Sequence, residues 1–336
     1  MLADRLRALL GRRLEAGSRA PLARALAVGW GAAAAVARPL RLPEGVRLVG
    51  IGGAVLGGAG KTPLAIALAR ALAAGGGRPA VIGHAYRARP ERPRIVQPDD
   101  AVATVGDDAL AAARLLAGSG AVVIVAPRRQ DAVDHAAALG HRILVADGLL
   151  QSSPHRLDAA VLALDALTPW GAGACPPAGD LRAPVPALLA HADHLAALLP
   201  EGTALAPELA RLGAIPVPSR IEGAVDSAGW RRSLAELAER RVGLLVTVAR
   251  PGRIVTALAA AGVRPTEVIA LADHAAPGAR DLQRAARAPV DAWVTTARCA
   301  TKLPPRLGDA PVLALAHRLE VGALAAAVAS HTGTGG

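Results

Sequence analysis

Short apolar runs recur along the chain, and longer stretches with a helical spacing of apolar residues separate them. In the first two-thirds, strands are predicted at 46–51, 79–83, 121–126, 142–146 and 159–164, and helices at 62–74, 109–117, 131–139 and 185–198. Strands that alternate with helices form βαβ units and a mostly parallel sheet. Residues 171–184 are rich in Gly and Pro and predict an ordered loop.

The same alternation returns in the last third of the chain. Strands are predicted at 242–248, 267–271, 291–295 and 311–315, and helices at 252–261 and 278–287. Because 336 residues exceed what one core usually supports, we expect more than one domain. The patterns predict a basic, membrane-proximal segment over 1–42 and a main, nucleotide-binding domain over 43–212. A connector is predicted over 213–232, and a smaller α/β domain that closes over the cleft over 233–336.

The composition explains what kind of core to expect. Apolar residues make up 52% of the chain and charged residues 19%, which suits a globular protein. The chain has no Phe, no Asn, one Tyr and only two Lys among 38 basic residues, so the core must be mostly aliphatic. In so biased a sequence, a surviving Lys or Tyr is more informative than usual.

The net charge of +11 is concentrated at the N-terminus. Residues 1–42 hold eight Arg and two acidic residues, while the rest of the chain is nearly balanced and has few aromatic residues for base stacking. We therefore expect no nucleic-acid partner. The 13 uncharged residues between Arg24 and Arg38 fall short of the roughly 20 needed to span a bilayer. They favour an amphipathic segment on an anionic membrane surface, or else a solvated helix that packs on the domain.

Cysteine and histidine usage gives no metal site. Cys175 and Cys299 are solitary, which suggests a reducing compartment. His191 and His194 are three residues apart on the helix predicted at 185–198, without an evident third ligand group, so a solvated face is favoured there.

The strongest motif lies between the strand at 46–51 and the helix at 62–74. It consists of Gly57, Gly58, Ala59, Gly60, Lys61, Thr62 and Pro63. Glycines allow backbone N–H groups to turn toward phosphate oxygens, and the helix N-terminus adds its positive end. In such a loop the Lys reaches the β- and γ-phosphates of ATP and the Thr hydroxyl binds Mg²⁺. The chain therefore has the features of a P-loop NTPase-like fold, although Val55 stands where the strict pattern has Gly or Ala.

Residues 49–63 also resemble the signature of the tetraacyldisaccharide 4′-kinases, the lipid A 4′-kinases of Gram-negative bacteria, which reads V-G-N-L-T-V-G-G-T-G-K-T-P. The further matches keep the family's order: residues 83–87 at S-R-G-Y-G, 105–108 at V-G-D-E, 146–151 at D-D-G-F-Q, 177–184 at P-A-G-P-L-R-E-P, Asp273-His274 at D-H, and 296–299 at T-E-K-D. Each match alone is weak, but the ordered set covers nearly the whole chain and is specific.

Several family residues are replaced in this chain. The replacements are Gly53 for Asn, His84 for Arg, Ala183 for Glu, and Ala297, Arg298 and Cys299 for the Glu, Lys and Asp of T-E-K-D. At D-D-G-F-Q, Asp147 is the second Asp if the alignment is made on Gly148, and the first if it is counted back from Gln151. One carboxylate is missing in either case, so the chain is a divergent member.

The resemblance implies roles for four side chains. Asp107 is the expected proton acceptor from the attacking sugar hydroxyl, and His274 is expected to orient it from the second domain. Asp108 is expected to assist with Mg²⁺, and Asp147, at a strand end, to meet Mg²⁺ or its water. The structural alternatives are acids that favour a helix N-terminus, a histidine at a helix start and an Asp-Gly turn.

The resemblance further implies a kinase that uses ATP and Mg²⁺ to phosphorylate the 4′-hydroxyl of tetraacyldisaccharide 1-phosphate, a lipid A precursor. Its expected place is peripheral, on the cytoplasmic face of the bacterial inner membrane, with no obligate protein partner. Two alternatives stay open because family carboxylates are missing. The chain is then a weakened relative that binds nucleotide or lipid A precursor, or another P-loop ATPase or switch.

Overall fold

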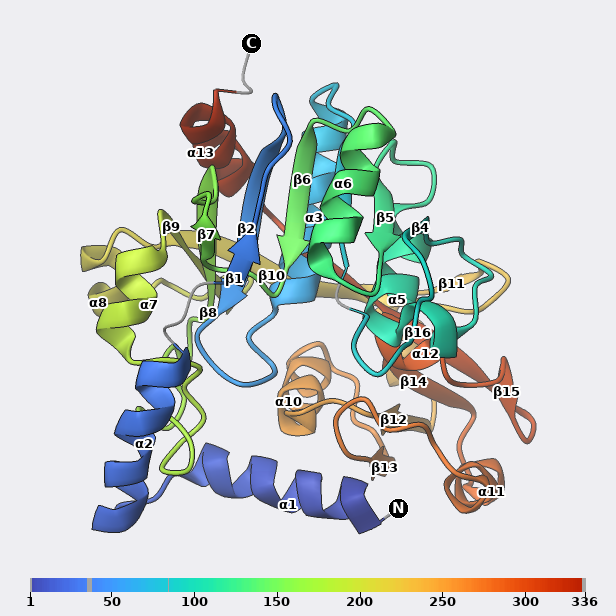
Figure 1. The fold of residues 1–336 in the computed structure, drawn as a ribbon. Coiled ribbons are helices and arrows are strands. Elements are labelled where there is room, and N and C mark those ends of the chain that lie inside the picture. The colour runs from blue at the N-terminus through green and yellow to red at the C-terminus, as the bar shows by residue number, and fades with distance from the viewer. Residues whose placement is uncertain (1, 35–37, 84, 334–336) are drawn as a thin grey trace. The chain divides into compact units, whose positions relative to one another are not determined.

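The computed structural model describes residues 2–34, 38–83 and 85–333. Contacts between residues divide the chain into two compact units (Figure 1). The larger unit contains Arg12–Pro218 and Leu319–Gly336, and the smaller unit contains Met1–Gly11 and Ser219–Arg318. Each unit is described by itself.

The larger unit contains a sheet that is parallel except at one edge. Its strands, in spatial order, are β9 (His194–Pro200), β8 (Ala159–Asp165), β2 (Arg47–Gly53), β6 (Ile143–Asp147), β3 (Pro79–Ile82), β5 (Val122–Val125) and β4 (Arg94–Ile95). Among the pairings described for these strands, only that of β4 with β5 is antiparallel. A separate parallel pair joins β1 (Arg38–Leu40) to β7 (Ser152–Pro154). The α/β fold class with a mostly parallel sheet, expected from the sequence, is confirmed.

Helices cover both faces of this sheet, as its alternating side chains require. The helices of the larger unit are α2 (Pro21–Ala34), α3 (Lys61–Ala74), α4 (Val102–Val105), α5 (Asp107–Leu116), α6 (Arg129–Ala138), α7 (Val185–His191), α8 (Pro207–Arg211) and α13 (Gly322–Thr332). Val49 and Val145 face a core shared with α3, α5 and α13. Leu48 and Leu144, their strand neighbours, face a second core with α6.

The two N-terminal helices are assigned differently to the two units. Helix α1 (Leu2–Ala16) has residues in both, and α2 belongs to the larger unit. One face of α2 packs: Ala27 is buried in a core with Val55 and Leu181, and a side chain at Gly31 would collide with Pro184. Among the described helices, none is both long and apolar enough to cross a bilayer.

The smaller unit has mainly parallel strands of its own. Its strands, in spatial order, are β13 (Glu267–Ala270), β12 (Val242–Val246), β14 (Ala292–Thr296), β16 (Ala310–Leu319) and β10 (Ile215–Val225), with β11 (Arg231–Arg232) beside β10 and β15 (Arg306–Leu307) beside β16. Its helices are α9 (Leu234–Ala238), α10 (Pro251–Ala260), α11 (Ala279–Arg287) and α12 (Ala297–Ala300). The alternation predicted from 242 onward is therefore observed.

One predicted element is wrong. The helix expected at 185–198 ends at His191, and β9 begins at His194. Ala and Leu favour a helix, and here the pairing with β8 overrides that local preference. His191 and His194 consequently do not share a helix face. The loop expected at 171–184 is correct, since these residues form neither helix nor strand.

The predicted boundaries also differ from those of the structure. Residues 213–232 are not a plain connector, because β10 runs through them despite Pro216 and Pro218. The smaller unit ends at Arg318, before the expected end at 336. The reason is that α13 buries Leu324 and Val328 in a core of the larger unit. Nor is 1–42 a unit of its own.

Candidate functional site

The phosphate loop connects β2 to α3 in the larger unit. β2 ends at Gly53 and α3 begins at Lys61, so Thr62 and Pro63 lie in the first helical turn as predicted. Gly57 and Gly60 have left-handed φ angles of 91° and 76°, which residues with side chains rarely adopt. At Gly60 a side chain would also collide with Leu198. The loop therefore requires glycine for both conformation and space.

The absence of the family Asn at position 53 has a local physical reason. A Cβ atom built on Gly53 would lie 2.9 Å from the Ala59 Cβ and 2.9 Å from Cγ and Cδ of Lys61. The loop and the Lys61 stem thus occupy the space that a larger residue would need. Gly53 lets Lys61 pack directly over the backbone of β2.

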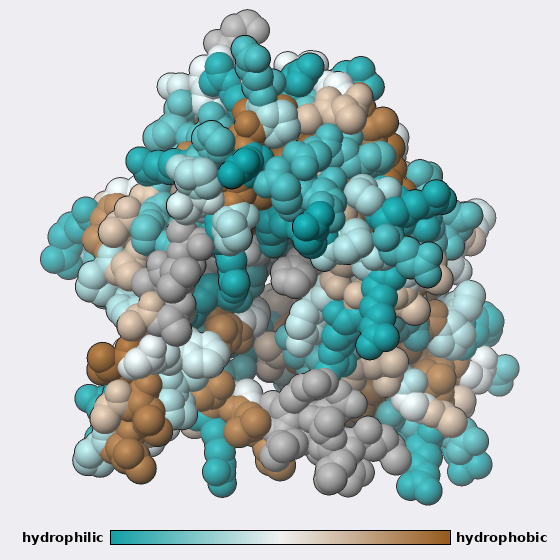
Figure 2. All heavy atoms as spheres, viewed as in Figure 1, coloured by the Kyte–Doolittle hydropathy of each residue, from teal (hydrophilic) through white to brown (hydrophobic). Residues whose placement is uncertain are grey.

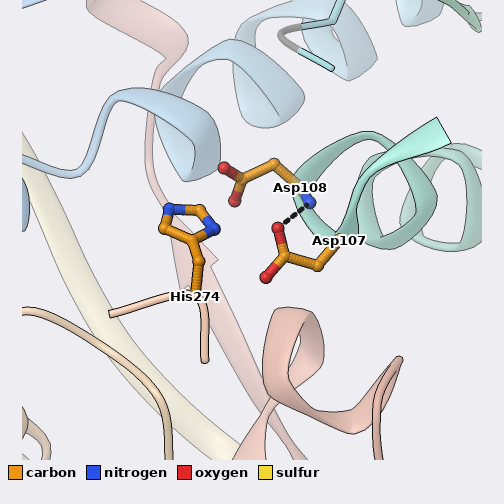
Figure 3. A group of neighbouring side chains, drawn as sticks. All are labelled: Asp107, Asp108 and His274. Atoms are coloured by element: carbon orange, nitrogen blue, oxygen red, sulfur yellow. Dashed lines mark hydrogen bonds between the residues drawn. The ribbon is translucent and has the colours of Figure 1, made fainter. Parts of the chain in front are cut away.

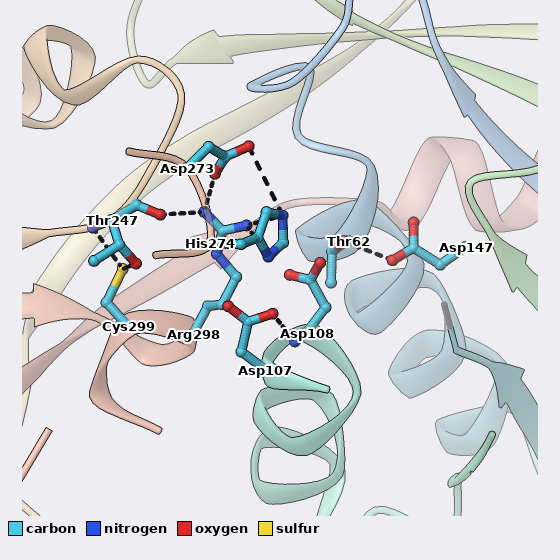
Figure 4. A network of polar contacts seen from close by, with 9 residues as sticks. All are labelled: Thr62, Asp107, Asp108, Asp147, Thr247, Asp273, His274, Arg298 and Cys299. Atoms are coloured by element: carbon cyan, nitrogen blue, oxygen red, sulfur yellow. Dashed lines mark hydrogen bonds and ion pairs between the residues drawn. The ribbon is translucent and has the colours of Figure 1, made fainter. Parts of the chain in front are cut away.

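Thr62 is joined to Asp147 by a hydrogen bond. The Thr62 hydroxyl donates to the Asp147 carboxylate over 2.6 Å (Figure 4). Asp147 is the last residue of β6, in register with Ile51 on the neighbouring β2, and is only 5% exposed. The hydroxyl after the phosphate-loop lysine and the carboxylate at the end of the next strand are therefore neighbours, as a magnesium site of this kind requires.

Asp107 and Asp108 form the first turn of α5, as Figure 3 shows. Asp107 is 4% exposed, and its Oδ1 accepts the Asp108 backbone N–H at 3.0 Å. Asp108, Thr62 and Asp147 line one small hollow of the larger unit. The three predicted metal ligands are therefore brought together, and all offer oxygen atoms, which suit Mg²⁺. Their place at a helix start also agrees with the structural alternative, favourable charge at a helix N-terminus.

Basic side chains lie close to Asp147. Arg129, half-buried at the start of α6, donates from Nη1 to the Asp147 carbonyl at 3.0 Å. Burial lowers the pKa of Arg129, and Arg38 lowers it further, while Asp147 opposes the shift. Arg182, from the loop before α7, lies within electrostatic reach of both Arg38 and Asp147. The three arginines create a positive region at the end of β6, suited to an anionic ligand.

The smaller unit contains the Asp273–His274 pair. Arg298, on α12, donates to Asp273 Oδ1 at 2.7 Å, and its Nη1 lies 2.7 Å from His274 Nε2 (Figure 4). His274 lies in a turn, so the structural alternative of a histidine at a helix start is not observed. Asp107 belongs to the larger unit, so the expectation that His274 orients it stays a prediction.

Sequence reasoning named most of these residues but missed two contacts. In the sequence Arg298 is only a replacement for the family Lys, and its bonds to Asp273 and His274 carry no sequence signal. Arg129 is one of many arginines in the chain, and its bond to the end of β6 depends on the fold. Its neighbour Arg128 pairs with Asp131 on the surface. His84 lies outside the described residues.

Comparisons with known proteins identify the relatives of this chain. The profile of the tetraacyldisaccharide-1-P 4′-kinase family matches residues 25–332. The tetraacyldisaccharide 4′-kinase of Rhodopseudomonas palustris (strain TIE-1) is 33% identical over 234 residues, which are 68% of this chain and 65% of that protein. The enzyme of the same name from Anaeromyxobacter dehalogenans (strain 2CP-1) is 36% identical over 288 residues, 78% of this chain and 74% of that protein.

A solved structure has the same fold. The crystal structure of LpxK from Aquifex aeolicus in complex with ATP superposes with a TM-score of 0.65 and 20% identity, over 88% of this chain and 90% of that one. This similarity supports the assignment of the P-loop kinase fold.

Proposed function

The chain belongs to the tetraacyldisaccharide-1-P 4′-kinase family, and on this premise we propose that it transfers the γ-phosphoryl group of ATP to the 4′-hydroxyl of tetraacyldisaccharide 1-phosphate. The observation that carries the proposal is the Thr62–Asp147 hydrogen bond beside the phosphate loop. It joins the two side chains that P-loop kinases use together, even though the sequence leaves the alignment of Asp147 ambiguous. The solved structural neighbour is itself a complex with ATP.

We propose that Thr62, Asp108 and Asp147 hold Mg²⁺. The residues fit this ion because they offer one hydroxyl and two carboxylates around one hollow, without the nitrogen or sulfur ligands that softer metals prefer. When bound, Mg²⁺ neutralises charge on the β- and γ-phosphates of ATP. All three proposed ligands are present in this chain, although other carboxylates of the family are missing.

The remaining proposed roles are phosphate binding by Lys61 and proton acceptance by Asp107. The Lys61 ammonium, after the glycine loop, binds the β- and γ-phosphates, and the backbone N–H groups at the start of α3 add to this charge neutralisation. Asp107 accepts the proton of the attacking hydroxyl. Because its carboxylate is buried, it is shielded from bulk water. His274 acts with Asp107, an assignment that rests on the family motif alone.

The positive region around Asp147 suits a phosphate group of a bound ligand. Arg129 and Arg182 together with Arg38 exceed what one carboxylate neutralises, and guanidinium groups bind phosphate through two parallel hydrogen bonds. We propose that this region receives an anionic part of the lipid A precursor or of ATP.

We also propose that the protein is peripheral to the cytoplasmic face of the inner membrane and docks through its N-terminal helices. Beside the packed face of α2 lies an exposed apolar stripe of Leu22, Leu26 and Trp30, spaced four residues apart and 72%, 57% and 46% exposed. Apolar side chains gather over α2 in Figure 2. An apolar stripe with nearby arginines is typical of helices that lie in the membrane interface.

The test uses purified protein, ATP, Mg²⁺ and tetraacyldisaccharide 1-phosphate. We expect a product heavier by one phosphate, which fragmentation in a mass spectrometer places on the 4′-oxygen. The same disaccharide with a methylated 4′-hydroxyl is the matched control and should gain none. Steady ATP hydrolysis without a phosphorylated lipid would instead favour a P-loop ATPase.

A further inference from the structure

Arg298 contacts three groups around the Asp273–His274 turn of the smaller unit. Its Nη2 donates to Asp273 Oδ1 at 2.7 Å and to the Thr247 carbonyl at 3.0 Å, and its Nη1 lies 2.7 Å from His274 Nε2 (Figure 4). A guanidinium is planar, always charged and presents its donors in a fixed fork. One side chain therefore fixes a carboxylate, a backbone carbonyl and an imidazole relative to one another.

The turn that carries His274 needs such support. His274 has φ 57°, and among the described residues only Arg87 shares a left-handed conformation without being glycine. This backbone region is unfavourable for a residue with a Cβ atom, so it persists only where the surroundings hold it. The His274 N–H donates to the Thr247 carbonyl at 3.0 Å, the same oxygen that accepts from Arg298.

The base of the Arg298 side chain is fixed in turn. Helix α12 starts at the end of β14, where the Thr296 hydroxyl accepts the Cys299 N–H at 3.1 Å. The Cys299 sulfur accepts the Thr247 N–H at 3.2 Å and is 1% exposed. Consecutive residues of α12 thus bind both the N–H and the carbonyl of Thr247. These bonds fix the backbone of α12 and so restrict where the Arg298 guanidinium can lie.

We propose that Arg298 is a positioning residue that sets the orientation of the His274 imidazole for the reaction. The proposal rests on the proposed function, in which His274 takes part. Arg298 and His274 side chains are 18% and 14% exposed, so water competes weakly for these bonds. A lysine at this place would keep the charge but not the fork, and would satisfy only part of the network.

The kinetic test compares Arg298→Met, which removes every donor, with Arg298→Lys. We expect Arg298→Met to lower kcat roughly 10- to 100-fold, because a misplaced His274 imidazole slows the reaction without weakening the binding of ATP. The KM for ATP should change little, and Arg298→Lys should restore part of the rate. Arg241→Met is the matched control, because it removes another arginine of this unit that is bonded to a carboxylate, Asp291, at 3.0 Å. It should leave kcat unchanged.

A second readout reports on the ring directly. The ¹⁵N–¹H signals of the His274 imidazole in the full-length protein are assigned by their loss in His274→Gln. They should move in Arg298→Met, move less in Arg298→Lys and stay in place in Arg241→Met. If Arg298→Met does not fold, as judged by thermal unfolding, the Lys variant gives both readouts.

The outcomes separate this proposal from the function on which it rests. Unmoved ring signals in the Arg298 variants overturn the positioning role, whatever the activity. Moved signals with an unchanged kcat in an active enzyme also overturn it, because the ring orientation would then not serve the reaction. If the wild-type protein phosphorylates no disaccharide, the proposed function fails, and the ring signals alone decide whether Arg298 holds His274.

Discussion

Thr62 and Asp147 are 85 positions apart in the chain, and their side chains meet because β2 and β6 are neighbours in the sheet. The carboxyl ends of parallel strands lie at the same edge, where ligands of open α/β sheets bind. A single hydrogen bond at this edge supports the proposed Mg²⁺-binding role of Asp147, which alignment of the motif leaves undecided.

The first prediction concerns Lys61. Replacing it with Ala removes the ammonium expected at the β- and γ-phosphates, and we expect turnover to fall by orders of magnitude while the fold persists. Kinase rates and thermal unfolding would be measured together. The matched control is Arg70→Ala, which removes one positive charge from the exposed side of the same helix. Normal lipid phosphorylation by Lys61→Ala would make the phosphate-loop assignment wrong.

The second prediction separates Asp107 from Asp147. Asp107→Asn keeps the shape of the side chain but cannot accept a proton, so kcat should fall roughly 10²- to 10⁴-fold with little change in ATP affinity. Asp147→Asn should instead raise the Mg²⁺ concentration needed for half activity, and added Mg²⁺ should partly restore the rate. Rate measurements over a Mg²⁺ titration decide between them.

Two other outcomes of the Mg²⁺ titration would contradict these assignments. If Mg²⁺ rescues Asp107→Asn and not Asp147→Asn, the two assignments are exchanged. If neither change affects the rate, the carboxylates of this chain do not perform the family's chemistry, and a protein that binds without turnover becomes the better account.

How much of the site is predictable differs from residue to residue. Lys61 and Thr62 are evident because a glycine loop between a strand and a helix has a strict local pattern. Asp107 and Asp108 need the family resemblance, since two acids before an apolar helix are common. The bonds of Arg298 are invisible to both approaches, because they depend on three segments that meet only in the folded unit.

At the scale of elements, the local pattern predicts short buried strands well, and it fails where a strand is built of helix-favouring residues. The core of β9 is built of Ala and Leu, which favour a helix. Its parallel register with β8, from Val161↔His194 onward, supplies the deciding contacts. Sequence periodicity contains no information about that neighbour.

Helix α13 shows the same limit at the end of the chain. It follows a strand of the smaller unit, yet its apolar side packs against α3 and the sheet of the larger unit. Chain order alone therefore assigns it to the wrong domain. A long-range contact of this kind is a tertiary property.

The third prediction tests that packing. Leu324 is fully buried in the α3–α5–α13 core. Leu324→Ala should lower the free energy of unfolding by about 2–5 kcal/mol through lost burial and a residual cavity. The measurement is denaturant unfolding, and the control is Ala326→Ser on the exposed side of the same helix. A loss below about 0.5 kcal/mol would contradict the docking of α13.

At the scale of the whole molecule, the distribution of charge and apolar surface matters more than the totals. The sequence places most of the net positive charge in residues 1–42. Six of the large apolar side chains that the structure leaves exposed lie in the same region: Leu9, Leu10, Leu22, Leu26, Val28 and Trp30. In the proposed membrane docking, charge attracts the segment to anionic lipid, and apolar contact retains it.

The last prediction follows from this surface. Replacing Leu22, Leu26 and Trp30 together by Gln should weaken binding to anionic vesicles at least about tenfold, because each buried apolar side chain contributes on the order of 1 kcal/mol in the interface. The control replaces Leu115, Leu139 and Leu212 by Gln, three leucines elsewhere in the larger unit that are 43%, 42% and 44% exposed. Co-sedimentation with vesicles measures both.

Salt and kinetics complete the test. Binding of the wild-type protein should weaken at high ionic strength, since exposed charges are screened within about 10 Å at 0.1 M salt. The α2 variant should raise the KM for the lipid far more than the KM for ATP, because only the lipid arrives from the membrane surface. Equal vesicle binding by the α2 variant and its control would return α2 to a helix that merely packs on the domain through Ala27 and Gly31.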